Sequence, residues 1–400
     1  MDPLPPPDSP ALDLPAPDPR VKLGDIAASA GLSRIHVLAW RDLDDVEAGG
    51  SEVHAANIAR LWSEAGIEVT MRTSYAQGHP PEDERDGYRV LRRAGRYMVF
   101  PRAALSEASG RHGPRDGLVE IWNGMPFLSP LWASQPRVVW LHHVHGDMWK
   151  MALPPRLAAM GQFLEHRVAP VLYRGTRIVT LSESSKRQLV DDLHFRAERV
   201  SVVPPGIDPR FRPGGERSAQ PLVVAVGRLV PVKHFDQLMR MMAEVRHLVP
   251  DARLTIVGEG YERRHLDELV HDLDAESWVT FAGRVSDDQL VDLYQKAWVV
   301  ASASSHEGWG MTLTEAAACR TPAVATRISG HLDAVSEGRG GLLADDERQF
   351  VAHLVTVLGD AEQRERLSRG ALEHADEFTW EATAAGTLQA LALEARRARR

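Results

Sequence analysis

Short apolar runs alternate with amphipathic stretches along this chain, and the pattern is regular from residue 34 onward. The run 34–40 (RIHVLAW) predicts a buried strand, and 67–74 (IEVTMRTS) predicts a second one. Between them the polar loop 41–52 leads into 53–66, whose apolar residues recur with helical spacing. A strand, a helix and another strand in this order make the basic unit of a parallel sheet.

The same alternation continues and then restarts after residue 204. Further strands in the first half are predicted at 118–122, 137–143, 177–182 and 200–206. The second half predicts strands at 221–229, 253–260, 278–283, 297–303 and 322–327, with helices at 234–249 and 263–273.

Both halves therefore predict an α/β protein with two doubly wound parallel sheets. We expect a disordered Pro- and Asp-rich tail at 1–32, domains at 33–205 and 221–376, a Pro- and Gly-rich linker at 206–220, and a final helix at 377–400 that packs back on the first domain. Ligands of such sheets bind at the carboxyl ends of the strands, so a shared ligand is expected in the cleft between the domains.

Composition narrows the function classes. A length of 400 residues suits two domains. A net charge of -8 and a pI near 6.1 argue against a nucleic-acid partner. Cys319 is the single cysteine, which fits a reducing cytoplasm. The first 20 residues lack the pattern of a signal peptide, and no apolar run reaches the ~18–20 residues that span a bilayer, so we expect a cytoplasmic protein.

A glutamate stands at each end of the segment Glu307–Glu315, and two glycines follow the first of them, where a predicted strand passes into a helix. Gly308 and Gly310 allow a tight turn and a close backbone approach, and the amides at a helix start are able to hold phosphate. The carboxylates on either side of the turn would then bind hydroxyl groups beside that phosphate. A structural role is also open, because Thr312 and Glu315 have the spacing of a capping box.

A second group of polar residues follows the first strand of the second half. The strand is expected to end at Gly227, and Arg228 and Lys233 lie on the turn before the next helix. Cations at a helix N-terminus are unfavourable for the helix dipole unless an anion binds there. A pyrophosphate would be such an anion, and two solvated surface cations are the alternative.

The pattern S-x-x-E-G-W-G-x-x-x-x-E-A at 304–316 resembles the signature of glycosyltransferase family 4, whose members are retaining enzymes of the GT-B fold, with two facing Rossmann-like domains. The resemblance implies that Glu307 contacts the hydroxyls of the donor sugar and that Glu315 binds the nucleotide ribose. It also implies that the diphosphate lies on the backbone amides of the helix start, at Gly310, Met311, Thr312 and Leu313.

Other segments are similar to the same family. The G-R-x-x-x-x-K pattern ending at Lys233 implies that Arg228 and Lys233 stabilise the leaving diphosphate. Gly50 belongs to a loop that in this family closes over donor and acceptor. The resemblance also implies nucleotide contacts at the strand ends marked by Gly227, Gly258, Arg284 and Val285. The segment 330–333 (GHLD) departs from the usual G-G-x-x-E, which leaves its contacts open.

Three histidines lie at the end of the strand predicted near residue 140. Family members carry one histidine there beside the reaction centre, which implies a catalytic role for His142; His143 is the alternative, because neighbouring strand residues face opposite ways. His145 completes a trio that suggests a metal, but no carboxylate at a suitable spacing joins it. Asp42 and Asp44 form an Asp-x-Asp that binds metal in a different transferase fold. We expect no metal site.

The implied reaction moves a sugar from a UDP- or GDP-linked donor to an acceptor hydroxyl with retention of configuration, and needs no cofactor beyond the donor. An inverting GT-B transferase, a sugar-nucleotide epimerase and a non-catalytic sugar-nucleotide-binding protein are the alternatives. Neither half carries the G-x-G-x-x-G of a nicotinamide-dependent dehydrogenase. The acceptor stays open. The stretch 150–177 mixes arginines with apolar residues, which favours either an anionic membrane or acceptor contact, or a solvated helix face.

Overall fold

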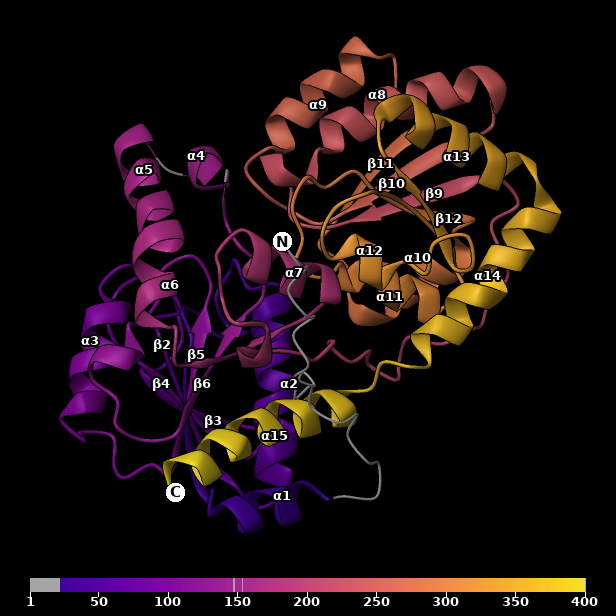
Figure 1. Ribbon diagram of the computed structural model, residues 1–400. Coiled ribbons are helices and arrows are strands. Elements are labelled where there is room, and N and C mark those ends of the chain that lie inside the picture. Colours follow the sequence, from indigo (N-terminus) through magenta and orange to yellow (C-terminus); the bar gives the residue numbers. More distant parts are fainter. Residues whose placement is uncertain (1–21, 147, 153, 400) are drawn as a thin grey trace, which may run out of the picture.

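The protein, described by a computed structural model over residues 22–399 apart from 147 and 153, consists of two α/β domains that stand side by side (Figure 1). The strands of the first domain are β1 (Arg34–Leu38), β2 (Glu68–Thr73), β3 (Glu82–Arg85), β4 (Tyr88–Arg92), β5 (Gly117–Trp122), β6 (Arg137–Leu141), β7 (Arg177–Thr180) and β8 (Val200–Val202). They form one sheet in the order β3-β4-β2-β1-β5-β6-β7-β8, in which β3 alone runs antiparallel to its neighbour.

The second domain has the same winding. Its strands are β9 (Leu222–Val226), β10 (Arg253–Val257), β11 (Val279–Gly283), β12 (Val299–Ser302), β13 (Ala323–Thr326) and β14 (Gly341–Ala344). They pair in parallel in the order β11-β10-β9-β12-β13-β14. The order reverses between β9 and β12, and ligands of doubly wound sheets bind at such a switch point.

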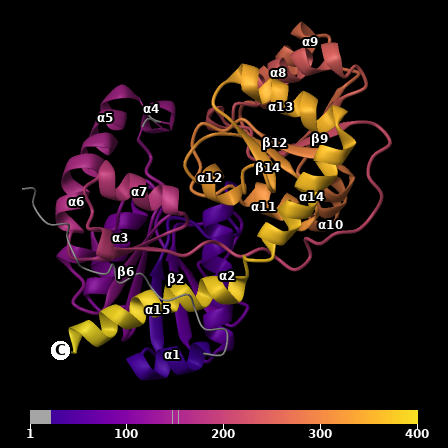
Figure 2. The same cartoon turned by 45° about the vertical axis from the view of Figure 1, so that its right-hand side comes forward.

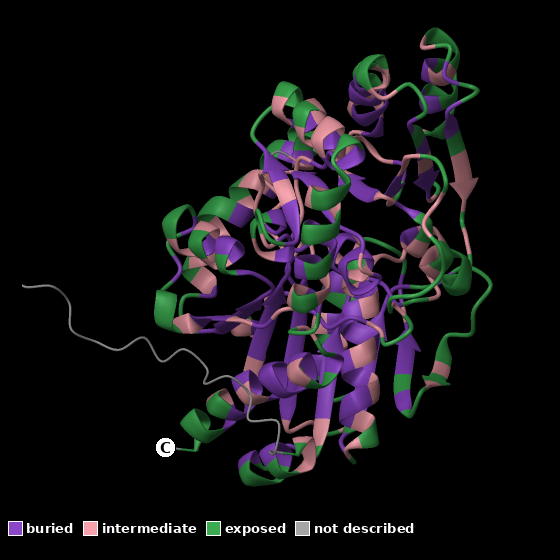
Figure 3. Cartoon of the chain, turned by 90° about the vertical axis from the view of Figure 1, so that its right-hand side faces the viewer, coloured by how far each residue is buried: buried purple, intermediate pink, exposed green. Residues whose placement is uncertain are grey.

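Helices cover both faces of each sheet. Those of the first domain are α1 (Leu23–Ala30), α2 (Gly50–Glu64), α3 (Val99–Ala108), α4 (Met148–Ala152), α5 (Pro155–Phe163), α6 (Ala169–Leu172) and α7 (Glu183–Asp191). Those of the second are α8 (Phe235–Leu248), α9 (Arg263–Asp272), α10 (Asp287–Lys296), α11 (Met311–Ala318), α12 (His331–Ala334), α13 (Glu347–Gly359) and α14 (Ala361–Ala375). Because helices cover both faces, most of the strands are near-continuous apolar runs, and Figure 3 shows most of them buried; the edge strand β3 is the exception.

The last helix, α15 (Trp380–Ala398), lies along the first domain beside α1 and α2 (Figures 1 and 2). Trp62 Nε1 of α2 donates a hydrogen bond to the Ala384 carbonyl at 3.0 Å. The two crossings between the domains touch each other, because a Cβ atom on Gly206 would lie 2.2 Å from the Trp380 nitrogen. None of the helices within the described residues is long and apolar enough to cross a membrane.

The predicted class, two doubly wound parallel sheets, is confirmed. The expected tail at 1–32 is wrong in its last third: α1 occupies Leu23–Ala30, because Ile26, Ala27 and Ala30 bury themselves in the first-domain core. Residues 1–21 of that tail lie outside the described residues.

Candidate active site

Strand ends from the two domains meet at the domain boundary. β6 runs into His142, and β12 runs into the turn that holds Glu307 and Gly308. A Cβ atom on Gly308 would lie only 2.2 Å from the His142 carbonyl oxygen, so this approach requires glycine. The Gly308 carbonyl also accepts a hydrogen bond from Ser182 Oγ of the first domain at 3.4 Å. The strand ends of the two domains are therefore closely packed where the domains meet.

Glu307 is held by a cation and a hydroxyl. Lys233 Nζ forms an ion pair with Glu307 Oε1, and the two side chains are only 20% and 18% exposed. Ser304 Oγ donates to the same oxygen at 2.9 Å. Burial raises the pKa of Glu307, but the Lys233 ammonium, the charge of His331 and the hydrogen bond from Ser304 together outweigh it and bring the pKa to about 2. The cleft thus holds a carboxylate that accepts hydroxyls beside an ammonium suited to phosphate.

The N-terminus of α11 lies directly after this turn. Gly310, the N-cap residue, has a φ of +106°, and a Cβ atom there would lie 3.1 Å from His331 Cδ2. The helix begins at Met311, so Thr312 lies inside the first turn and makes no side-chain cap, and the capping-box interpretation is wrong. Amides of a first helical turn lie outside the helical ladder; the Leu313 amide donates to the Gly310 carbonyl at 2.9 Å.

Glu315 is turned toward α10 rather than back to the helix start. The Tyr294 hydroxyl donates to Glu315 Oε2 at 3.1 Å. Burial raises the pKa of Glu315 to about 7, against the hydrogen bond from Tyr294, which lowers it. Near neutral pH this carboxyl is therefore partly protonated and partly ionised. Hydroxyl groups that donate hydrogen bonds to it would favour the ionised form.

The first loop of the first domain faces the cations of the second. Arg228 is exposed on the turn after β9, and a Cβ atom on Gly49 would lie 3.9 Å from its Nε. A Cβ atom on Gly50 would lie 3.1 Å from Met311 Sδ. The Gly49 amide donates to Glu52 Oε2 at 2.8 Å, which fixes the start of α2 at this point. The structure thus brings Gly50, Arg228 and Met311 together across the domain boundary.

The histidines after β6 take two directions. His142 is buried against α2, with Nε2 3.3 Å from Nδ1 of His54. His143 stacks on His145, with ring centroids 4.6 Å apart. Burial lowers the pKa of His143 to about 4, and the charge of Glu307 opposes that shift. The pKa of His142 is lowered by burial and by the neighbouring histidines. A Cβ atom on Gly308, the residue after Glu307, would lie 3.5 Å from His143 Cβ, and His143 is half-buried whereas His142 is buried. The geometry therefore favours His143, the alternative, as the histidine beside the ion pair.

The strand ends on the other side of the switch point are tied together by their backbones. The Gly258 amide donates to the Gly283 carbonyl at 2.9 Å, and a Cβ atom on Gly258 would lie 2.0 Å from the Gly227 oxygen. Arg284, which is exposed, and Val285, which is half-buried, follow directly. These residues line one side of the switch point, while Glu307 and α11 line the other.

Asp333 links the domains at the segment that departs from the family pattern. Its carboxylate accepts hydrogen bonds from the amides of Glu183 (3.0 Å) and Ser184 (3.2 Å), and also from the Ser184 hydroxyl. The Gly330 amide donates to that hydroxyl at 2.9 Å. A carboxylate at the N-terminus of α7 is favourable for the helix dipole, so the aspartate stabilises this arrangement of the domains.

The Asp-x-Asp motif binds arginine. Asp42 Oδ2 accepts from Arg92 Nε at 2.7 Å, and Asp44 pairs with Arg92 Nη2 at 2.5 Å and with Arg85. These pairs anchor the first loop to β3 and β4. Over the described residues, no group of three or more His, Cys, Asp or Glu side chains is arranged to hold a metal ion.

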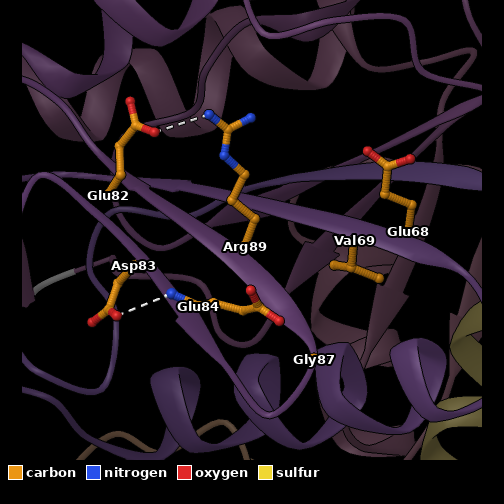
Figure 4. Close-up of a pocket in the computed structure, with 7 residues that line it drawn as sticks. All are labelled: Glu68, Val69, Glu82, Asp83, Glu84, Gly87 and Arg89. Carbon is orange, nitrogen blue, oxygen red and sulfur yellow. Dashed lines mark hydrogen bonds and ion pairs between the residues drawn. The ribbon is translucent and has the colours of Figure 1, made fainter.

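Cavities in the described part of the chain include two that are each lined by residues of a single domain. One, of about 380 Å³, opens at the edge of the first sheet beside β3 (Figure 4). Glu68, Glu82, Asp83 and Glu84 line it, with Arg89 paired to Glu82, so its charge disfavours a diphosphate. The other, of about 290 Å³, lies at the carboxyl ends of β12, β13 and β14, behind Ser304.

Fold and site together define a class, the sugar-transferring enzymes with two facing Rossmann-like domains. The profile described as "Glycosyl transferases group 1" matches residues 207–374, and that of "Glycosyltransferase Family 4" matches residues 48–211. A D-inositol 3-phosphate glycosyltransferase of Acidothermus cellulolyticus is 32% identical over 385 residues, which cover 86% of this chain and 85% of the relative.

Solved structures agree with this fold. The sucrose-phosphate synthase of Thermosynechococcus elongatus superposes with a TM-score of 0.76 at 20% identity, covering 88% of this chain and 96% of that one. Anabaena HepE in complex with UDP-glucose gives 0.70 at 18% identity, covering 89% and 98%. The chain belongs to the group 1 glycosyltransferases of family 4, has the GT-B fold, and is a glycosyltransferase.

Three positions around the site were not assigned from the sequence. Ser304 donates a hydrogen bond to Glu307. Because it lies only three residues before the glutamate on a short turn, this contact could have been predicted from the sequence. Tyr294 contacts Glu315 from a different helix, and Asp333 reaches α7 across the domain boundary. Neither of these two contacts has a signal in local spacing.

Proposed function

We propose that the protein transfers a sugar from a nucleoside diphosphate sugar to an acceptor hydroxyl with retention of the anomeric configuration. The observation that carries the proposal is the Glu307–Lys233 pair beside the N-terminus of α11, with His143 opposite. Helix amides and cations suit a diphosphate, and the ionised Glu307 suits sugar hydroxyls. Glu315 would accept hydrogen bonds from the ribose.

In this proposal the protein stabilises the charge that grows on the leaving diphosphate. Arg228, Lys233 and the first-turn amides of α11 would supply that stabilisation, with ~3–4 kcal/mol from each well-placed donor. The departing phosphate would accept the proton of the acceptor hydroxyl, so no covalent nucleophile is needed. His143 would position the reacting groups from the first-domain side. No divalent metal and no further cofactor enter the scheme.

The comparisons guide the choice of substrates. Anabaena HepE is described in complex with UDP-glucose, which supports a UDP-sugar as the first donor to test, ahead of GDP-sugars. The curated relatives are D-inositol 3-phosphate glycosyltransferases, which supports a phosphorylated cyclitol as the first acceptor to test. The buried, single Cys319 suits a reducing compartment such as the cytoplasm.

A thermal-shift screen against UDP-, GDP- and ADP-linked sugars tests the proposal, because a ligand that binds the folded state raises the melting temperature. We expect a UDP-sugar to raise it, and the Glu315→Gln variant to show a smaller shift at the same ligand concentration. Slow donor hydrolysis without acceptor would distinguish an enzyme from a non-catalytic binding protein. If no nucleoside diphosphate sugar shifts the wild-type protein, the proposal is wrong.

A further inference from the structure

One surface segment of the first domain exposes large apolar side chains. α5, a π-helical turn at Leu164–Val168 and α6 follow one another without a break. Leu157, Met160, Phe163 and Val171 on this segment are 47%, 51%, 60% and 72% exposed. Large apolar residues this exposed and this close together mark an interaction site rather than ordinary surface.

The same segment is cationic, although the whole chain carries a net charge of -8. Arg156, Arg167 and Arg174 are exposed, and the structure records no ion pair between any of them and a described residue. Arg156, Met160 and Phe163 are spaced four and three residues apart in the sequence. The arginine and the two apolar side chains therefore lie on the same face of the helix. Between 154 and 175 the one acidic residue is Glu165.

Glu165 is turned inward and does not offset the surface charge. Its carboxylate accepts hydrogen bonds from the amides of His145 (2.8 Å) and Gly146 (2.9 Å) and from Trp149 Nε1 (3.2 Å). A Cβ atom on Gly161 would lie 2.6 Å from the Trp149 ring. The segment is therefore fixed to the loop that carries the active-site histidines.

The segment also lies close to the boundary between the two domains. α4 contacts both α5 and the turn Pro231–Lys233 of the second domain. Figures 1 and 2 show α4 and α5 projecting from the first domain, with α4 on the side nearer the second domain. A surface that held α5 would therefore lie next to the entrance of the donor and acceptor site.

We propose that this segment docks the protein on an anionic lipid bilayer. Met160, Phe163 and their apolar neighbours enter the interface while the arginines pair with lipid phosphates, as in amphipathic helices that lie on a membrane without crossing it. A second copy of the chain is a poorer occupant, because a two-fold contact would bring the same arginines together. That the docked surface delivers an acceptor to the cleft rests on the proposed function.

Vesicle flotation with the full chain tests the docking. The wild type should float with vesicles that contain phosphatidylglycerol and not with pure phosphatidylcholine, and binding should weaken with salt. Arg156→Glu/Arg167→Glu/Arg174→Glu should weaken it on the order of a hundredfold or more, and Met160→Ser/Phe163→Ser by roughly tenfold. The matched control is Leu248→Ser/Arg264→Glu on α8 and α9, where Leu248 is 69% and the Arg264 side chain 92% exposed; it should float like wild type.

No flotation of the wild type, equal binding to neutral vesicles, or equal loss in the control would overturn the proposal. So would a dimer in sedimentation velocity that Met160→Ser/Phe163→Ser dissociates without lipid. The thermal shift by a nucleotide sugar is measured on the same samples. Flotation without that shift would count against the proposed function alone, and the shift without flotation would count against docking alone.

Discussion

Replacing Lys233 with Met removes the charge that faces Glu307 while it keeps most of the apolar stem. The fall of the Glu307 pKa from 4.5 to about 2 corresponds to roughly 3 kcal/mol of stability at neutral pH. His331 and Ser304 supply part of this, so we expect Lys233→Met to lower the free energy of unfolding by about 1–3 kcal/mol at pH 7. As a solvated surface cation, the alternative that the sequence left open, Lys233 would contribute little.

The contribution of Glu307 to the free energy of unfolding depends on pH in a defined direction. Because the folded pKa of Glu307 is lowered, its contribution is present above about pH 4.5 and is lost as the pH falls toward 2. The variant should lack this loss, because Glu307 without its cation remains buried and its pKa should rise.

Urea denaturation at pH 7 and at about pH 3, inside the range in which the contribution is lost, measures both effects. Lys296→Met is the control, since that side chain is 51% exposed and pairs with the exposed Asp292, and it should cost less than ~0.5 kcal/mol. The double variant Lys233→Met/Glu307→Gln should recover most of the loss, because no unpaired charge stays buried. A Lys233→Met protein within ~0.5 kcal/mol of wild type at pH 7 would refute the reasoning.

Further predictions concern the other site residues. His143→Ala should slow sugar transfer by ~100-fold or more while UDP still binds, whereas His142→Ala should mainly lower the melting temperature; the reverse pattern would restore His142 to the reaction centre. Glu315→Gln should weaken nucleotide binding by about 1–3 kcal/mol. Wild-type affinity in calorimetry should rise from pH 6 to 8 as Glu315, with its pKa of about 7, ionises, and the variant should show no such rise. Gly308→Ala should reduce activity and open the domains in small-angle scattering, because its Cβ would lie 2.2 Å from the His142 oxygen. Turnover should persist in EDTA, and restoration by magnesium or manganese after its loss would contradict the site.

The periodic segments of the fold were predictable because the buried strands are short apolar runs and the helices between them repeat apolar residues at helical spacing. β3 and β4 were missed although Asp86 and Gly87, with φ of +47° and +83°, form the two-residue turn between them. β3 reads EDER, and its charges hid the strand because it lies at an edge and faces solvent. α1 was missed because it packs against α15, which lies more than 300 residues away in the sequence, so its local sequence does not show what buries it.

The site divides in the same way. Glu307, Gly310 and Glu315 sit on one turn and one helix, so their spacing carries the information. The choice between His142 and His143 depends on which face of β6 is covered by α2, and only the folded chain supplies that. The partner of Glu307 was also hidden, because Lys233 lies 74 residues away and reaches it from the neighbouring strand end.

Proton NMR of the first product formed from a nucleoside diphosphate α-sugar tests the central claim most directly. The claim is that the paired Glu307 and Lys233 support transfer with retention, so the new glycosidic bond should have the α configuration of the donor. The Lys233→Met variant should form that product far more slowly. A β-linked product would show inversion and contradict the account, and so would unchanged α-product formation by Lys233→Met.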